Sequence, residues 1–324
     1  MRITLAITSD ARGRRLWERL SRSSGMTLID RCYGLTDTFN SIEHKPPHIV
    51  IYSEDMTKHP EFSTMESLCK CLSVRWMVLA ELGSVAKPGV HLLDPLASDY
   101  DFYNAIAACA RSRPAPVVTP DAGLFRAPST KKFAKTVLLG SSTGGVDALL
   151  NILGAFPVDC PPTVIVQHTG AGYGASLARV LNQRVEPIVR EARHGETLAS
   201  GTVVIASGSE AHLRLKPGAP VTCALERGDR ITGHCPSVDA LFTSAVPMAQ
   251  HVVAAILTGM GRDGAHGLLA LRKAGSRTIS QDEATSVVYG MPQAAAKLGA
   301  SEKVLPLSAI GPALLRAAQV QVPI

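Results

Sequence analysis

Hydrophobic residues in the first third of the chain fall into short runs, separated by amphipathic stretches with a helical period. The runs predict strands at 3–8, 27–31, 49–52, 76–80 and 91–93. The amphipathic stretches at 12–22 and 100–110 predict helices. Strands that alternate with helices favour a parallel sheet with helices on both faces.

The same alternation returns after residue 133 and continues to the end of the chain. The strands expected there are 136–139, 163–166, 203–205, 252–257 and 278–280. The expected helices are 146–153, 238–248, 265–273 and 312–318. The stretch 186–230 is rich in Gly, Val and Thr, which predicts a β-meander or a hairpin.

Between these regions, from 111 to 132, the periodicity disappears and prolines punctuate a polar stretch, which is typical of an extended linker. The predicted fold class is therefore α/β with two doubly wound domains. The first covers residues 1–112, and the linker covers 113–132. The second, over 133–324, has a mostly parallel sheet and carries the candidate chemistry described below.

Composition narrows the classes of function. The chain has 324 residues, of which 46% are hydrophobic and 19% charged, as in an ordinary soluble protein. Its net charge of +6 would suit an acidic partner. The basic residues are dispersed, however, apart from Lys131, Lys132 and Lys135, so we expect no nucleic-acid binding. Seven irregularly spaced cysteines favour neither a disulfide framework nor a metal site.

No segment predicts membrane insertion. The longest apolar run, 252–257, is far shorter than the ~20 residues that a spanning helix requires. The apolar run at the N-terminus is short and ends in a polar turn, which indicates a strand rather than a secretion signal. We therefore expect a cytoplasmic protein.

The sharpest chemical signal follows the strand at 136–139. Gly140-Ser141-Ser142-Thr143-Gly144 fits the pattern G-x-S-x-G, with Ser142 at the nucleophile position. A hydroxyl on a glycine turn before a helix lies close to free N–H groups, which stabilise an anion. The competing interpretation is a turn that cradles a nucleotide phosphate, but that predicts an acidic residue closing the next strand. Here that strand closes with Gln167-His168.

Two further strand ends present groups suited to the same chemistry. His168 follows a strand that is expected beside the one carrying Ser142, where an imidazole suits proton transfer. Asp263 follows the strand 252–257 after the closely placed Gly259 and Gly261. Helix capping alone would explain Asp263, but it does not explain the two glycines, which indicate a close backbone approach. The chain order Ser, His, Asp disfavours an α/β-hydrolase, in which the acid precedes the histidine.

These motifs, with others in the same order, resemble the catalytic domain of the chemotaxis-type protein-glutamate methylesterases from about residue 136 to 318. The remaining matches are His234-Cys235-Pro236-Ser237-Val238-Asp239, Gln281-Asp282-Glu283-Ala284 and Tyr289-Gly290-Met291-Pro292. So many blocks in one order make a chance match very improbable.

The resemblance implies a Ser142 nucleophile, a His168 general base and acid, and an Asp263 that orients the histidine. It implies an oxyanion-binding backbone N–H at Met260, and we place Thr143 and His234 in the same pocket. The family hydrolyses γ-glutamyl methyl esters on the cytoplasmic signalling helices of chemoreceptors, and many members also deamidate glutamines there. No cofactor or metal is implied. With a serine nucleophile, Ser142→Ala should lose several orders of magnitude in rate, while Ser141→Ala should cost little.

The family usually carries an N-terminal receiver, and residues 1–112 are similar to one in outline. Its phosphotransfer needs an acidic pair, an acceptor Asp and a Lys at set strand ends. Here those positions hold Ser9-Asp10, Ser53 and Asp94. With few carboxylates for Mg²⁺ and no Lys, the pattern predicts a pseudo-receiver that serves as a docking or autoinhibitory module. The partner that we expect for this domain is a chemotaxis signalling protein. Asp55 lies close to Ser53 and is the alternative phosphoryl acceptor, so the pseudo-receiver interpretation requires that Asp55 is not phosphorylated.

A second class of function stays open beside the esterase. Because the receiver-like domain lacks the phosphotransfer residues, the chain could also be a non-catalytic interaction protein that binds chemoreceptors or signalling partners through both domains. The candidate triad favours the enzyme, and methanol release from methylated receptors separates the two hypotheses. Glutamine deamidation needs the same three residues and is decided by the release of ammonia.

Overall fold

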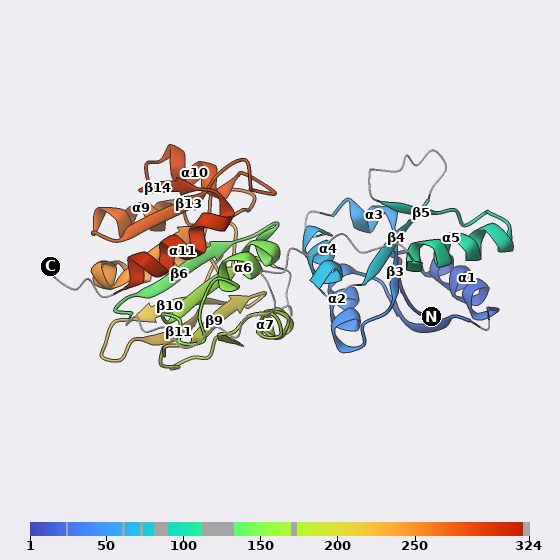
Figure 1. The fold of residues 1–324 in the computed structure, drawn as a ribbon, viewed down its shortest axis with the longest axis horizontal. Helices are drawn as coiled ribbons and strands as arrows, with labels where there is room; N and C mark the ends of the chain where they lie inside the picture. Colours follow the sequence, from blue (N-terminus) through green and yellow to red (C-terminus); the bar gives the residue numbers. More distant parts are fainter. Residues whose placement is uncertain are drawn as a thin grey trace. The chain divides into compact units, whose positions relative to one another are not determined.

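The computed structural model describes residues 1–23, 25–59, 62–71, 74–80, 90–111, 133–169 and 174–319. The chain divides into two compact units, Met1–Val118 and Thr119–Ile324. Each unit is α/β, as the alternating pattern predicts (Figure 1). The predicted linker 113–132 lies outside the described residues.

The N-terminal unit is a five-stranded parallel sheet in the order β2-β1-β3-β4-β5. This is the flavodoxin-like doubly wound order that receiver domains also have. Its strands are β1 (Arg2–Ala6), β2 (Thr27–Cys32), β3 (Ile49–Ser53), β4 (Arg75–Leu79) and β5 (His91–Leu93). Its helices are α1 (Asp10–Ser21), α2 (Leu35–His44), α3 (Glu54–Thr57), α4 (Phe62–Cys71) and α5 (Asp99–Arg111).

The C-terminal unit is built on seven parallel strands in the order β14-β13-β12-β6-β7-β9-β8. The strands are β6 (Thr136–Ser141), β7 (Thr163–Gln167), β8 (Ile188–Glu191), β9 (Thr202–Ser207), β12 (Val252–Ile256), β13 (Arg277–Gln281) and β14 (Lys303–Leu305). The chain runs from β6 to one edge of the sheet and later continues from β12 to the other. The direction therefore switches between β6 and β12, where sheets of this class bind ligands.

The helices of this unit follow the predicted pattern, with additions. They are α6 (Gly145–Leu153), α7 (Gly174–Asn182), α8 (Val238–Ser244), the 3₁₀ helix η1 (Val246–His251), α9 (Ala265–Lys273), α10 (Met291–Lys297) and α11 (Leu307–Ala318). The stretch 186–230 contributes β8 and β9 to the main sheet. It also forms the predicted hairpin, β10 (Ala211–Lys216) with β11 (Thr222–Arg227).

Two helix predictions were wrong in extent. The single helix expected at 238–248 ends at Ser244, because Pro247 has no N–H to donate and the chain tightens into the 3₁₀ helix. The helix expected to begin at Pro312 begins earlier, at Leu307, and contains the proline. No helix among the described residues is long and apolar enough to cross a membrane.

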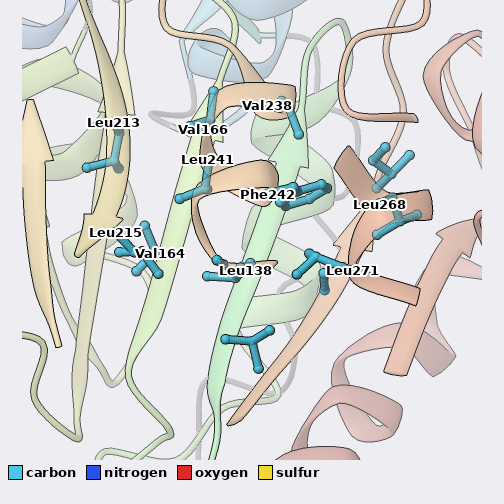
Figure 2. Close-up of a cluster of buried hydrophobic side chains, with 14 of the residues drawn as sticks. Leu138, Val164, Val166, Leu213, Leu215, Val238, Leu241, Phe242, Leu268 and Leu271 are labelled. Carbon is cyan, nitrogen blue, oxygen red and sulfur yellow. The ribbon is translucent and has the colours of Figure 1, made fainter. Parts of the chain in front are cut away.

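Alternating side chains of the buried strands fill a core on each face of the C-terminal sheet. On one face Leu138 and Val164 pack against Leu241 and Phe242 of α8, with the hairpin and α9 beside them (Figure 2). On the other face Val137 and its neighbours pack against α6 and α11. The strands are apolar on both faces, as parallel strands between helical layers must be. Their carboxyl ends are therefore fixed by packing on both sides.

Candidate active site

The strand register places Ser142 and His168 next to each other. Ser141 is the partner of Gln167 in the β6–β7 pair, so Ser142 and His168 are the residues that follow at adjacent strand ends. The amide of His168 donates to the carbonyl of Ser141 at 2.9 Å, and the amide of Ser142 donates to the carbonyl of Thr258 at 3.0 Å. Ser142 thus lies at the switch point, between the end of β7 and the segment that follows β12.

Glycines allow the close approaches around Ser142. Gly144 has a φ of 78° and stands at the N-terminus of α6, where a side chain would meet Val287. A Cβ on Gly259 would lie 2.6 Å from the Cβ of Ser142 and 2.5 Å from the Sδ of Met291. The sequence prediction that a glycine here permits a close backbone approach is confirmed for Gly259.

Gln167 braces this region, a role that the sequence reasoning did not foresee. Its Nε2 donates to the carbonyls of Ser142, at 2.8 Å, and His168, at 2.9 Å. Its Oε1 accepts from the hydroxyl of Ser141 at 2.5 Å. The side chains of Ser141 and Gln167 are fully buried, whereas Ser142 retains 9% of its exposure. A polar side chain directly after the apolar run 164–166 was the available signal.

His168 and Asp263 meet through a hydrogen bond. The Nε2 of His168 lies 2.8 Å from the Oδ2 of Asp263, which is fully buried. The carboxylate also accepts from Ser237 Oγ at 2.8 Å and from the amides of Val238, at 2.8 Å, and Asp239, at 3.1 Å. Burial alone would raise the pKa of Asp263, but these bonds and the imidazole of His168 lower it below its ordinary value. Asp263 is thus an anion with several donors.

The structure also shows whether Asp263 caps the helix that follows it, as one interpretation of the sequence would have it. The N-cap of α9 is Gly264, with a φ of 87°, so Asp263 does not cap the helix that follows it. It accepts instead from the first turn of α8, where the free amides and the helix dipole favour a negative charge. Asp263 therefore accepts from the amino end of α8, which lies earlier in the chain, and not from α9.

The other predicted pocket residues lie on neighbouring loops. Met260 follows Gly259 and exposes 57% of its surface, and Gly261 after it has a φ of 87°. Thr143 is half-buried, and its carbonyl accepts from the hydroxyl of Thr258 at 2.9 Å. The ring of His234 stacks on the ring of His168, with centroids 3.8 Å apart and planes within 5°. His234 therefore contacts the proposed base directly, which its position in the sequence did not reveal.

Most of the cysteines in the described part of the chain are buried. Six of them are free thiols in the described part of the chain. Burial raises the pKa of Cys160 and Cys223 to about 12, which keeps these thiols protonated and inert. Within the described ranges, no three His, Cys, Asp or Glu residues are grouped so that they could hold a metal.

In the N-terminal unit the residues near the receiver positions engage one another. Asp10 pairs with Arg14, and its Oδ1 lies 3.1 Å from Arg31 and accepts from the hydroxyl of Tyr33 at 3.1 Å. The Oδ2 of Asp55 accepts from the hydroxyl of Thr8 at 2.6 Å. The carboxylate of Asp10 therefore pairs with two guanidinium groups, which compensate its charge.

Comparison with known proteins places the chain in a family. A family model described as CheB methylesterase matches residues 137–314. The chain belongs to the CheB methylesterase family. The matched region contains every residue of the candidate site and, apart from Ala318, the buried residues of both clusters of the C-terminal core.

Similar proteins agree with this assignment. A Rhizobium etli protein named protein-glutamate methylesterase/protein-glutamine glutaminase is 45% identical over 323 residues, which cover 92% of this chain and 90% of that protein. A Gluconobacter oxydans protein of the same name is 50% identical over 226 residues, 68% of this chain and 63% of its own length. The crystal structure of the Thermotoga maritima CheB methylesterase catalytic domain is 37% identical with a TM-score of 0.55. It covers 56% of this chain and 98% of that domain.

Proposed function

We propose that this protein hydrolyses glutamyl methyl esters on the cytoplasmic signalling helices of chemoreceptors, with Ser142 as nucleophile. The observation that carries the proposal is the hydrogen-bonded pair of His168 and Asp263 at the strand end next to Ser142. The similarity to proteins named methylesterase supports the same chemistry. We place the enzyme in the cytoplasm because the proposed substrate region faces that compartment.

In the proposed reaction the imidazole of His168 takes the proton of the Ser142 hydroxyl as the oxygen attacks the ester carbonyl. The bond to Asp263 occupies Nε2 and keeps a proton there, which leaves Nδ1 as the base. His168 then returns the proton to the departing methoxide, so that methanol leaves and an acyl-serine remains. Water activated by the same imidazole hydrolyses the acyl-serine and releases a glutamate carboxylate.

Backbone donors would stabilise the negative charge that forms on the carbonyl oxygen. We assign this role to the N–H of Met260, in the glycine-flanked segment whose neighbour Gly259 presses against Ser142. One such donor contributes about 10²–10³ in rate. Thr143 lies in the same turn as Ser142, and we place it in the pocket with Met260.

Deamidation of glutamine follows the same path with ammonia as the leaving group. The two relatives carry the glutaminase name as well as the esterase name. We therefore propose deamidation as a second activity of the same site. Release of ammonia that depends on Ser142 is the measurement that decides it.

We propose that the N-terminal unit is a pseudo-receiver that regulates or docks the enzyme without taking up a phosphoryl group. The pairing of Asp10 with Arg14 and Arg31 supports this, because the guanidinium groups compensate its charge in place of a metal. A chemotaxis signalling partner is the contact that we propose for this unit.

The test of the esterase is methanol release from methylated receptor membranes. We expect Ser142→Ala to lower the rate by about 10³-fold or more, because the other two residues cannot act without the nucleophile. Ser141→Ala is the matched control, since it removes the adjacent hydroxyl.

The control keeps the nucleophile but leaves Oε1 of Gln167 without its donor, at a cost in stability of about 1–3 kcal/mol. We therefore expect Ser141→Ala to release methanol at a rate near that of the wild type, at a lowered unfolding temperature. The sequence analysis expects only a small effect of Ser141→Ala on the rate, and the structure adds an expected loss of stability. If Ser142→Ala released methanol at the wild-type rate, the protein would use another nucleophile, and if the wild type released none, it would be a binding module.

A further inference from the structure

Two imidazole rings lie face to face at the candidate site. The rings of His168 and His234 are almost parallel, with their centroids 3.8 Å apart. His168 follows β7, whereas His234 lies in the segment between β11 and α8. The contact therefore joins two elements that are distant in the sequence.

The backbone around His234 is built to hold one conformation. Ile231 and His234 exchange both backbone hydrogen bonds, each at 3.0 Å, across Thr232 and Gly233. Thr232 has a φ of 52° and Gly233 one of 86°. The left-handed conformation at a β-branched residue costs about 1–3 kcal/mol and persists only where the surroundings enforce it. The hydroxyl of Thr232 donates to Oδ2 of Asp239 at 3.2 Å, which offsets part of that cost.

A buried histidine braces both ends of the same segment. The Nε2 of His212 donates to the carbonyl of Asp229 at 2.9 Å, and its Nδ1 accepts from the amide of Ser237 at 3.2 Å. Because Nδ1 accepts, the proton must be on Nε2, so His212 is neutral and structural. The segment from 229 to 237 is thus held at its turn by Asp239 and at its ends by His212.

Within the part of the chain that the structure describes, the His168 ring is held by a hydrogen bond at one of its two nitrogens only. Its side chain is 7% exposed and has one hydrogen bond, from Nε2 to Asp263. Its Nδ1 is buried and has no hydrogen-bond partner among the described residues. A bond at one nitrogen leaves the ring free to turn about that axis, and a face-to-face contact removes this freedom.

We propose that His234 is a positioning residue, whose ring holds the plane of His168 so that Nδ1, which has no hydrogen-bond partner among the described residues, can accept the Ser142 proton in the reaction. This rests on the proposed esterase reaction. The role needs a flat, uncharged ring in that place and no proton transfer by His234 itself.

The electrostatic surroundings favour the neutral ring. Burial, first, and the positive form of His168, second, lower the pKa of His234. The other charged groups that act on it are Asp263, which raises its pKa, and Arg230, which lowers it. The neutral ring avoids repulsion when His168 takes the serine proton.

The test compares His234→Ala with His234→Phe in full-length protein, using methanol release from methylated receptor membranes. A small loss of alignment costs up to about 10²-fold in rate, so we expect His234→Ala to lower kcat by about 10- to 100-fold with KM little changed. His234→Phe keeps a flat ring, and we expect it to restore kcat to within about tenfold of the wild type. The acidic limb of the pH profile of His234→Phe should stay at the wild-type pH, because the proposed role involves no proton transfer by His234.

The outcomes separate this proposal from the proposed function. If the wild type releases methanol and His234→Ala equals it, the positioning role is wrong and the esterase stands. If His234→Phe is as slow as His234→Ala while both remain folded, His234 acts through its nitrogen atoms, which also overturns the proposal. If the wild type and Ser142→Ala release methanol equally, the proposed esterase reaction with Ser142 as nucleophile is wrong.

A spectroscopic readout removes dependence on activity. The proton between His168 and Asp263 gives a low-field NMR signal only while the ring is held against the carboxylate. We expect this signal to persist in His234→Phe and to broaden or disappear in His234→Ala. A signal unchanged in His234→Ala would contradict the positioning role.

Discussion

At the scale of single residues, the candidate site depends on buried polar groups whose partners are fully specified. Gln167 satisfies three groups at the ends of β6 and β7, and Asp263 accepts from four donors. Such groups are costly to bury unless they are paired, so each fixes the position of its neighbours. The Ser142 hydroxyl and the His168 imidazole, the proposed nucleophile and base, are therefore attached to backbone that has little freedom to move.

The lowered pKa of His234 predicts how stability depends on pH. Burial and the charge of His168 lower it from the ordinary value of 6.5, so below that pH the unfolded chain binds a proton that the folded one refuses. Stability therefore falls as the pH drops through about 6.5 toward the lowered value. His234→Phe lacks this term, and we expect it to gain stability relative to the wild type between about pH 7.5 and 5.5.

The measurement is urea unfolding followed by hydrogen exchange in peptides of β6 and β12. Fluorescence would report the other unit, because both tryptophans, Trp17 and Trp76, lie there. A difference between the variant and the wild type that stayed constant with pH would show that His234 titrates normally in the folded state.

At the scale of elements, the strand ends of the C-terminal unit could be predicted and their contacts could not. The apolar runs that end at Ser141 and Gln167 are unambiguous, and the residues after them carried the chemical signals. The helices α7 and α10 and the short strand β14 were missed, because their apolar patterns are brief. The stacking of His234 on His168 arises from a loop packed by tertiary contacts, for which the sequence has no period.

Gly259 is the element-scale feature that lies closest to the proposed nucleophile, Ser142. A Cβ there would lie within 2.6 Å of both Met291 Sδ and the Cβ of Ser142, so the turn must move. We expect Gly259→Ala to lower kcat for methanol release by about 10- to 100-fold. Gly228→Ala is the control, since its nearest neighbour would be His212 at an ordinary 3.6 Å. Equal rates in the two variants would show that the approach of Gly259 does not position Ser142.

At the scale of the whole molecule, the two units differ in how their candidate groups are paired. The C-terminal unit has its candidate groups at a switch point between parallel strands. The N-terminal unit has the topology of a receiver but pairs Asp10 with arginines. Topology could be predicted for both, whereas these ion pairs depend on side-chain packing that the sequence pattern does not encode.

We expect no stable labelling of the protein by acetyl phosphate with Mg²⁺. Asp10 is compensated by Arg14 and Arg31, and the acceptor position is held by Ser53. Intact-mass measurement checks this, with an unmodified receiver domain as the positive control. Stoichiometric addition of a phosphoryl group at Asp55 would contradict the pseudo-receiver and make Asp55 the acceptor.

The central claim is that Ser142, His168 and Asp263 act as one unit, and double-variant kinetics test it most directly. Methanol release is measured for Ser142→Ala, for His168→Ala and for the pair combined. Since neither group works without the other, we predict that the double variant is no slower than Ser142→Ala alone. A double variant slowed by the product of the two single effects would show that the residues act independently, and the account would be wrong.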